Sequence, residues 1–367
     1  MRILLPTLAP FPSSDASVVQ VAQMAQAFAA LGHDVLLVAP IPGAGSVADV
    51  LGEEPRFSVR TLSRRVHRGQ SYVHALRIAA LARRWRPDLV HSRNLRGSLL
   101  LALRGVPTIL EAHTIGALSG RQDRWALRRL LAAPGGRGIV AISAALAHDL
   151  ASELEVDADR ILVAHDAVRP PTEVPPSRAG SGPLHVVYTG SLYPGKGAEA
   201  LIEVARRCPW ARFSIAGGPD VRAAALGSRA EALGLSNLTV LGPLPPVAAR
   251  ALQVEADVLV APFSRRVESD SGHDIARWTS PMKLFEYLAS GRPTVVSDLP
   301  VLREVVRPDV DALMVPPDDP EALVRALERL RDDPDLGVRL ATAALERVRD
   351  EFTWELRARR ILKRFGA

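Results

Sequence analysis

Short apolar runs alternate with amphipathic stretches along the chain. Residues 1–7 (MRILLPT) and 33–40 (HDVLLVAP) are apolar, which predicts two buried strands. Between them, residues 17–32 (SVVQVAQMAQAFAALG) have the spacing of an amphipathic helix that ends at Gly32. The same alternation continues through apolar runs at residues 88–93, 106–113 and 138–143. It predicts βαβ units and a parallel sheet.

The alternation stops at residues 168–183 (VRPPTEVPPSRAGSGP), a segment with five prolines that is typical of an interdomain linker. It then resumes, with strands expected at residues 184–192, 212–218, 238–244, 256–263 and 292–298 and helices at 198–208 and 281–290. We therefore expect an α/β protein with two Rossmann-like domains facing across a cleft. Their ranges are 1–168 and 184–350, joined by a Pro-rich linker at 169–183 and followed by a C-terminal helix at 351–367.

The composition narrows the class of protein. A chain of 367 residues is long enough for two domains. Its one cysteine, Cys208, excludes an internal disulfide and a cysteine-rich zinc site, and fits a reducing compartment. The N-terminal apolar run is broken by prolines and is not typical of a signal peptide. No apolar run approaches the ~20 residues of a membrane span, so we expect a cytoplasmic protein.

Positive charge is concentrated in residues 1–170, which hold 20 Arg and 14 Asp plus Glu and so account for the whole net charge of +6. One arginine cluster is Arg64, Arg65 and Arg68. A second has helical spacing and contains Trp125 among Arg121, Arg124, Arg128 and Arg129. Such a cluster fits a solvated basic face, a peripheral contact with an anionic membrane, or a grip on an acidic acceptor. No signature of nucleic-acid binding accompanies it.

Familiar cofactor motifs are absent. No Gly-x-Gly-x-x-Gly follows an expected strand and no Walker lysine loop occurs, which argues against a dinucleotide dehydrogenase or a P-loop enzyme. Three Asp-x-Asp triplets, starting at Asp157, Asp309 and Asp333, lie in turn-like segments. We predict no metal site and no cofactor.

Lysine occurs only at Lys196, Lys283 and Lys363, in a chain whose other basic residues are all arginine. Ser280 and Pro281 are typical of an N-cap and a first helical residue, which places Lys283 in a first helical turn. A lysine there opposes the helix dipole but, with the N–H groups of that turn, favours a bound phosphate. Glu286 follows on the same helical face, where its carboxylate suits the diol of a ribose.

Lys196 lies in a glycine-rich loop, YTGSLYPGKG, between an expected strand and an expected helix. Gly190, Gly195 and Gly197 would let the backbone approach a ligand closely, and a lysine in such a loop is typical of a phosphate site. The alternative for each lysine is a solvated surface residue. Two of the three lysines in such turns favour a phosphate ligand.

Several segments resemble the family 4 glycosyltransferases. GSLYPGKG, SIAGGPD, SPMKLFEYLASGRPTVVSDLPVLREVV and DALMVPPDDPEALVRALERL resemble the donor domain of that family, and LVHSR, VPTILEAHT and AISAAL resemble its acceptor domain. The sequence is most similar to a subgroup with an SPxKxxEY donor motif. The resemblance implies the GT-B architecture, in which the C-terminal helix crosses back to the first domain. It also implies retaining, metal-independent transfer of a sugar from a UDP- or GDP-sugar, with the nucleotide-sugar as co-substrate.

The resemblance also implies roles for particular residues. Glu286 should bind the ribose, Lys196 the diphosphate, and His113 should lie beside the transferred sugar. The remaining donor-binding residues would be Gly190, Ser191, Gly195, Gly197, Ser280, Pro281, Met282, Lys283 and Leu284. The acceptor side would include Ser13, Ser14, His91, Arg93, Asn94 and Glu111.

Three positions depart from the family. Trp278 stands where a first glutamate is expected, with Asp274 or Glu268 as candidate substitutes. Ser191 stands where an arginine is expected, and PFPSSDAS replaces a glycine pair. The departures leave open a catalytically silent partner subunit or nucleotide-sugar-binding protein, and a sugar phosphorylase or epimerase. We expect a role in cell-surface glycan or glycoconjugate synthesis. The acceptor is left open as a glycan, a lipid-linked molecule or a small molecule.

Overall fold

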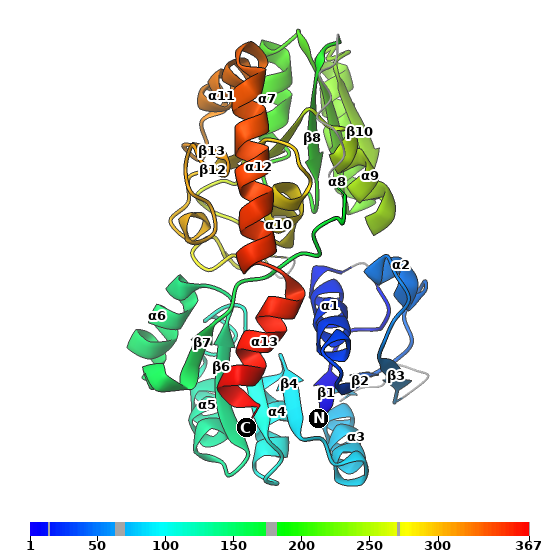
Figure 1. Cartoon of the computed structure of the whole chain (residues 1–367), viewed down its shortest axis with the longest axis vertical. Helices are drawn as coiled ribbons and strands as arrows, with labels where there is room; N and C mark the ends of the chain where they lie inside the picture. The colour runs from blue at the N-terminus through cyan, green and yellow to red at the C-terminus, as the bar shows by residue number, and fades with distance from the viewer. Residues whose placement is uncertain (14, 63–69, 174–181, 270–271, 367) are drawn as a thin grey trace. The chain divides into compact units, whose positions relative to one another are not determined.

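The computed structural model describes residues 1–367 except residues 14, 63–69, 174–181, 270–271 and 367 (Figure 1). The chain forms two compact units. Met1–Asp166 and Trp354–Ala367 make up the first unit, and Ala167–Thr353 makes up the second. Most of the expected linker at 169–183 lies outside the described residues.

In its described residues, the first unit has a seven-stranded parallel sheet in the order β3-β2-β1-β4-β5-β6-β7. Its strands are β1 Arg2–Pro6, β2 Asp34–Ala39, β3 Ser58–Thr61, β4 Leu89–Ser92, β5 Thr108–Ala112, β6 Gly136–Ala141 and β7 Ile161–Val163. Its helices are α1 Ala16–Ala30, α2 Val47–Leu51, α3 Gln70–Trp85, α4 Leu95–Ala102, α5 Arg121–Ala132, α6 Ala144–Leu154, the 3-10 turn η1 Ala158–Arg160, and α13 Trp354–Phe365.

The central strands of this sheet are buried on both faces, which explains their continuous apolar runs. Leu4 of β1 and Val90 of β4 pack with Leu101 of α4 in one apolar cluster. The chain leaves β1 toward β2 on one side and returns as β4 on the other. In open parallel sheets, ligands bind at the carboxyl ends of the strands beside such a reversal.

In its described residues, the second unit has a six-stranded parallel sheet in the order β10-β9-β8-β11-β12-β13. Its strands are β8 Leu184–Thr189, β9 Ala211–Ala216, β10 Leu238–Gly242, β11 Val258–Ala261, β12 Thr294–Ser297 and β13 Leu313–Val315. Its helices are α7 Ala200–Arg207, α8 Asp220–Ala232, α9 Pro246–Glu255, α10 Met282–Ala289, η2 Leu302–Glu304, α11 Pro320–Asp332 and α12 Pro334–Glu351.

The core of the second unit joins strands and helices across the sheet. Tyr188 of β8, Val260 of β11 and Leu327 of α11 are fully buried members of one apolar cluster, which also contains Cys208. Strand order reverses between β8 and β11, so the carboxyl ends of these two strands mark the expected ligand position in this unit.

The last helix, α13, completes the first unit. It packs against α1 and β6, although it follows α12 of the second unit in sequence (Figure 1). Ala358 and Ile361 supply its apolar contacts and are fully buried. The buried charged residue Arg357 lies on the same helix.

Among the helices in the described part of the chain, none combines the length and apolar character that a membrane crossing needs.

Candidate functional site

Lys283 lies at the carboxyl end of the second sheet, between two aromatic rings. Its Nζ is 4.0 Å from the ring centre of Tyr188 and 4.5 Å from that of Phe263, and it donates a hydrogen bond of 3.2 Å to the carbonyl oxygen of Lys196. Burial lowers the pKa of the Lys283 ammonium well below its usual value, and the charge of Lys196 lowers it further. The arrangement holds two cationic side chains close together, which favours an anionic ligand.

Gly190 gives the Lys283 side chain its space. Gly190 has φ of 134°, and a Cβ there would lie 3.2 Å from Lys283 Cδ. Gly195 and Gly197 also have positive φ, but a Cβ at these positions would strike the protein's own Arg266 and Pro262 carbonyl oxygens, at 1.9 Å and 2.3 Å. These two glycines therefore admit the loop after β11, and their expected contact with a ligand stays a prediction.

The start of α10 differs by one residue from the expectation. Pro281 is the N-cap, with an extended ψ of 114°, and the helix begins at Met282 rather than at Pro281. Lys283 still lies in the first turn, where N–H groups have no partner within the helix. Leu284 is a correction as well, because its side chain is buried and its N–H bonds to the Pro281 carbonyl at 2.9 Å. It offers no group to a ligand.

Glu286 is held by a polar network that the sequence did not reveal. Gln253 of α9 donates from Nε2 to Glu286 Oε2 at 3.2 Å and to Thr189 Oγ1 at 2.8 Å. Tyr287 in turn donates from its hydroxyl to the Thr189 carbonyl at 2.9 Å. Burial raises the pKa of Glu286, against the hydrogen bond from Gln253 and the charge of Arg250. The network fixes one carboxylate oxygen of Glu286 beside the end of β8.

The residues at the departures from the family have structural roles of their own. Ser191 is exposed, and its carbonyl accepts the Tyr188 hydroxyl at 2.8 Å. Asp274 Oδ1 accepts the N–H groups of Val267 and Ala276, both at 3.0 Å. Asp274 therefore holds its own loop through Oδ1, and its substitution for the absent glutamate stays a prediction. Glu268 pairs with Arg266 at 3.5 Å.

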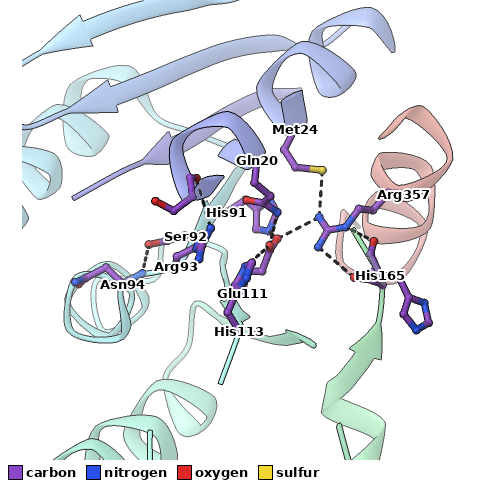
Figure 2. Close-up of polar contacts among 12 residues, drawn as sticks. Gln20, Met24, His91, Ser92, Arg93, Asn94, Glu111, His113, His165 and Arg357 are labelled. Atoms are coloured by element: carbon purple, nitrogen blue, oxygen red, sulfur yellow. Dashed lines mark hydrogen bonds and ion pairs between the residues drawn. The ribbon is translucent and has the colours of Figure 1, made fainter. Parts of the chain in front are cut away.

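In the first unit, Glu111 is the centre of a buried cluster (Figure 2). Its side chain is 1% exposed. Oε1 lies 2.8 Å from His113 Nε2 and accepts the Gln20 amide, while Oε2 lies 2.6 Å from His91 Nε2 and 3.2 Å from Arg357 Nη1. Burial by itself raises the pKa of Glu111, but the charge of Arg357, the interaction with His91 and the hydrogen bond from His113 outweigh it and hold the pKa well below its usual value.

His113 is the member of this cluster that reaches solvent, with 21% of its side chain exposed. Burial, reinforced by the charge of Arg93, lowers the pKa of His113 to about 4, although the hydrogen bond to Glu111 opposes this. The ring is thus neutral near pH 7. Since an ionised carboxylate can only accept, Nε2 carries the proton and Nδ1 keeps a lone pair.

Arg357 was not singled out from the sequence. Its guanidinium reaches from α13 to Glu111 and also donates to the carbonyl oxygens of His165 at 2.9 Å and Ala164 at 3.2 Å. It contacts Met24 Sδ at 3.1 Å (Figure 2). Nearby, burial raises the pKa of Asp166 to about 6, although the charge of Arg357 opposes this. No local motif marks Arg357, because its partners are distant in sequence.

Other expected acceptor-side residues serve the local fold. Asn94 caps α4 by accepting the Gly97 N–H, and Arg93 donates to the Ser17 carbonyl at 3.4 Å. Ser13 donates to Asp15 at 3.2 Å. Ser14 lies outside the described residues. His91, Glu111 and His113 are the expected residues that the structure brings together in this unit.

The structure describes one of the two arginine clusters, the one on α5. Arg64, Arg65 and Arg68 lie outside the described residues. On α5, Arg128 pairs with Glu155 at 2.5 Å, and Arg124 donates to the Ser119 and Glu153 carbonyls. Trp125 is exposed. Within the described part of the chain, no group of three or more His, Cys, Asp or Glu side chains has the arrangement of a metal site.

Comparison with known proteins assigns both halves of the chain. Residues 17–170 match the sequence model of glycosyltransferase family 4, and residues 183–333 match that of the group 1 glycosyl transferases. Together these ranges span most of the chain. Each model covers less than half of the chain, and both models describe glycosyltransferases. The expected GT-B architecture is confirmed by solved glycosyltransferases that superpose on both parallel-sheet units.

Three relatives illustrate the likeness. Glycogen synthase of Mycobacterium tuberculosis is 26% identical, over 90% of this glycosyltransferase and 86% of that protein. A glycosyltransferase from Rickettsia africae has a TM-score of 0.78 at 16% identity, covering 100% of this chain and 97% of that one. HepE of Anabaena, solved in complex with UDP, has a TM-score of 0.75 at 15% identity and covers 99% of both chains.

Proposed function

We propose that the protein is a retaining, metal-independent glycosyltransferase that moves a sugar from a UDP- or GDP-sugar to an acceptor hydroxyl. The observation that carries this proposal is the pairing of Lys283 with Lys196 at the start of α10 and beside the end of β8. Two relatives support it: HepE has been solved with UDP and with UDP-glucose, and glycogen synthase is a polysaccharide-forming enzyme by name. We extend this to a role in cell-surface glycan or glycoconjugate synthesis.

Stabilisation of the leaving group is the main expected source of catalysis. Negative charge develops on phosphate oxygens as a nucleoside diphosphate departs. Lys196, Lys283 and the first N–H groups of α10 stabilise that charge without a proton transfer. Each such group typically lowers the barrier by about 3 kcal/mol. A diphosphate also supplies the counter-charge that Lys283 meets only in part from aromatic rings and a carbonyl.

Glu286 is assigned to the ribose of the donor. One of its carboxylate oxygens accepts from Gln253, and the remaining acceptor positions suit the two hydroxyls of a ribose. In the first unit, His113 offers Nδ1 as an acceptor for a hydroxyl of a carbohydrate ligand. The SPxKxxEY motif is thereby assigned to donor binding through its lysine and its glutamate.

Binding of nucleotides tests the proposal directly. We expect calorimetry with UDP, GDP and ADP to find one preferred nucleotide for the wild-type protein. Lys196→Ala and Glu286→Ala should each weaken it at least about tenfold, or about 1.4 kcal/mol. The matched controls are Lys363→Ala, at the third lysine of the chain, and Glu231→Ala, at an exposed glutamate of α8, and both should bind like wild type. Equal binding by all four variants would refute the assignment.

A second candidate is a nucleotide-sugar-binding protein without turnover. Trp278 in place of a glutamate and the structural use of Asp274 favour it. Release of UDP or GDP from the matching nucleotide-sugar, followed with a panel of sugar and lipid-linked acceptors, distinguishes the two. Turnover in the presence of EDTA supports the first candidate, provided that NMR shows the same anomeric configuration in the product as in the donor. Donor that is bound but never consumed supports the second.

A further inference from the structure

Arg357 is the most distant contributor to the cluster around His113. It comes from α13, 246 residues after Glu111, yet its side chain is 3% exposed and its Nη1 lies 3.2 Å from Glu111 Oε2. Its other donors bond to two backbone carbonyl oxygens, so the guanidinium is fixed in place. Apolar packing of α13 alone would not require Arg357 to form these hydrogen bonds.

We propose that Arg357 is a positioning residue, which acts through Glu111 to hold the His113 ring with Nε2–H inward and Nδ1 available to a carbohydrate hydroxyl. The inference rests on the proposed function for the role of Nδ1. It does not depend on the identity of the donor.

The argument starts from the charge of Glu111. A buried carboxylate must be balanced by a nearby positive charge. Arg357 supplies that charge permanently, because a guanidinium does not lose its proton in proteins. With Arg357 in place, Glu111 is balanced while His113 is neutral. Without it, balance requires a proton, either on Glu111 itself or on a histidine that contacts it, and His113 is the member of the cluster that reaches solvent.

Protonation would remove the function of His113. An imidazolium has a donor on both nitrogens, so Nδ1 could no longer accept a hydrogen bond. The charge of Arg357 is one of the effects that lower the pKa of His113, together with burial and Arg93. The charged and titratable groups of the cluster around His113 come from four elements or their ends: Glu111 on β5, His91 and Arg93 on and after β4, Asp166 after β7, and Arg357 on α13.

The decisive experiment observes the His113 ring itself. The protein is labelled with ¹⁵N-histidine, and the His113 signals are assigned by their loss in His113→Gln. In wild type, we expect a neutral ring with the proton on Nε2 from about pH 5 to about pH 8. In Arg357→Met, we expect the midpoint of His113 protonation to rise by at least about one pH unit. Arg360→Met, an exposed arginine on the same helix, is the matched control and should resemble wild type.

Turnover gives a second readout that a purely structural role would not move. In Arg357→Met, kcat should fall by about half at the raised midpoint of His113 protonation and further below it, and the deficit should vanish about two pH units above that midpoint as His113 loses its extra proton. The KM for the donor should change less than about threefold. In Glu111→Gln/Arg357→Met both charges are gone, so His113 should again be neutral and kcat should return to within about tenfold of wild type.

Several results would overturn the proposal. One is a His113 ring that stays neutral, with the proton on Nε2, in Arg357→Met, including the case in which His91 takes the proton. Another is a loss of kcat that does not vary with pH. If Arg357→Met fails to fold, the double variant decides: a titrating His113, or a kcat more than about tenfold below wild type, overturns the proposal. Because the NMR measurement needs no substrate, it remains decisive even if no donor is turned over.

Discussion

The two units treat buried charge in opposite ways. In the second unit, Lys283 and Lys196 bring like charges together, and Glu286, the carboxylate one turn along α10, bonds to Gln253 instead of Lys283. In the first unit, Glu111 is surrounded by an arginine and two histidines, so its charge is balanced within the protein. Under the proposed function, an external anion balances the lysine pair of the second unit, whereas the Glu111 cluster of the first unit needs no ligand to balance its charge.

The largest expected effect is on the stability of the balanced cluster. Glu111→Leu leaves Arg357 buried without its partner, which should lower the free energy of unfolding by about 3–5 kcal/mol. Glu111→Leu/Arg357→Met should recover most of that loss. Urea unfolding followed by circular dichroism measures both variants. Similar losses for the single and the double variant would mean that the pair does not act as a unit.

The Glu111 cluster should also make the free energy of unfolding depend on pH in the acid range. The pKa of Glu111 in the folded chain lies well below its unfolded value of 4.5, so its charge stabilises the fold above about pH 4.5. This contribution is lost as the pH falls through the lowered pKa. In Glu111→Leu the acid-dependent part of the unfolding free energy should be smaller than in wild type.

Substitution of Lys283 in the second unit should lower activity without lowering stability. Lys283→Met removes a partly buried ammonium but keeps the length of the side chain beside Gly190. We expect kcat/KM for donor to fall about 100- to 1,000-fold, since one donor to a developing anion is lost. The thermal midpoint should be equal to that of wild type or higher, because activity residues commonly cost stability. A variant that loses both activity and stability would contradict the comparison.

The network behind Glu286 should give a smaller effect. Gln253→Leu removes the hydrogen bonds to Glu286 and Thr189 at a similar side-chain volume. We expect the affinity for the preferred nucleoside diphosphate to fall about threefold to tenfold, within the range of one or two hydrogen bonds. Inorganic diphosphate, which has no ribose, is the control ligand and should bind equally well. Equal losses of affinity for the two ligands would mean that Gln253 supports binding of the phosphates and not of the ribose.

The smallest expected effect is the pH dependence of nucleotide binding. A bound diphosphate raises the lowered pKa of Lys283, so Lys283 takes up a proton on binding wherever it is neutral in the free protein. Affinity should therefore decrease, by a few-fold, as the pH rises above the lowered pKa. Calorimetry in two buffers with different ionisation enthalpies measures the proton uptake. The Lys283→Met protein should take up fewer protons on binding. An unchanged uptake would mean that a group other than Lys283 binds the proton.

Local patterns in the sequence were sufficient for the fold. The apolar runs of β1, β8 and β11 and the alternation with helices predicted two Rossmann-like units, which the structure and its GT-B relatives confirm. Each of these signals lies within a few residues, where the geometry of a strand or a helix turn imposes the spacing. The start of α10 was wrong by one residue because proline at position 281 suits both an N-cap and a first helical residue.

The supporting residues of the candidate site could not be found in this way. Gln253 and Arg357 lie inside amphipathic helices, where a glutamine or an arginine is ordinary, and their partners are 33 and 246 residues away. Gly195 and Gly197 illustrate the reverse problem. Their sequence context is typical of a phosphate loop, but the carbonyls they accommodate belong to a second loop whose approach depends on tertiary packing.

The order of Glu111 and Arg357 along the chain has a consequence for biosynthesis. A ribosome adds about 5–20 residues per second, so the 246 residues between the two side chains take roughly 10–50 s to make. For that interval the nascent first unit holds an acidic core residue whose arginine has not yet been translated. Its folding should therefore wait until Arg357 has been made, and chains that stop before Arg357 should be substrates for chaperones and proteases.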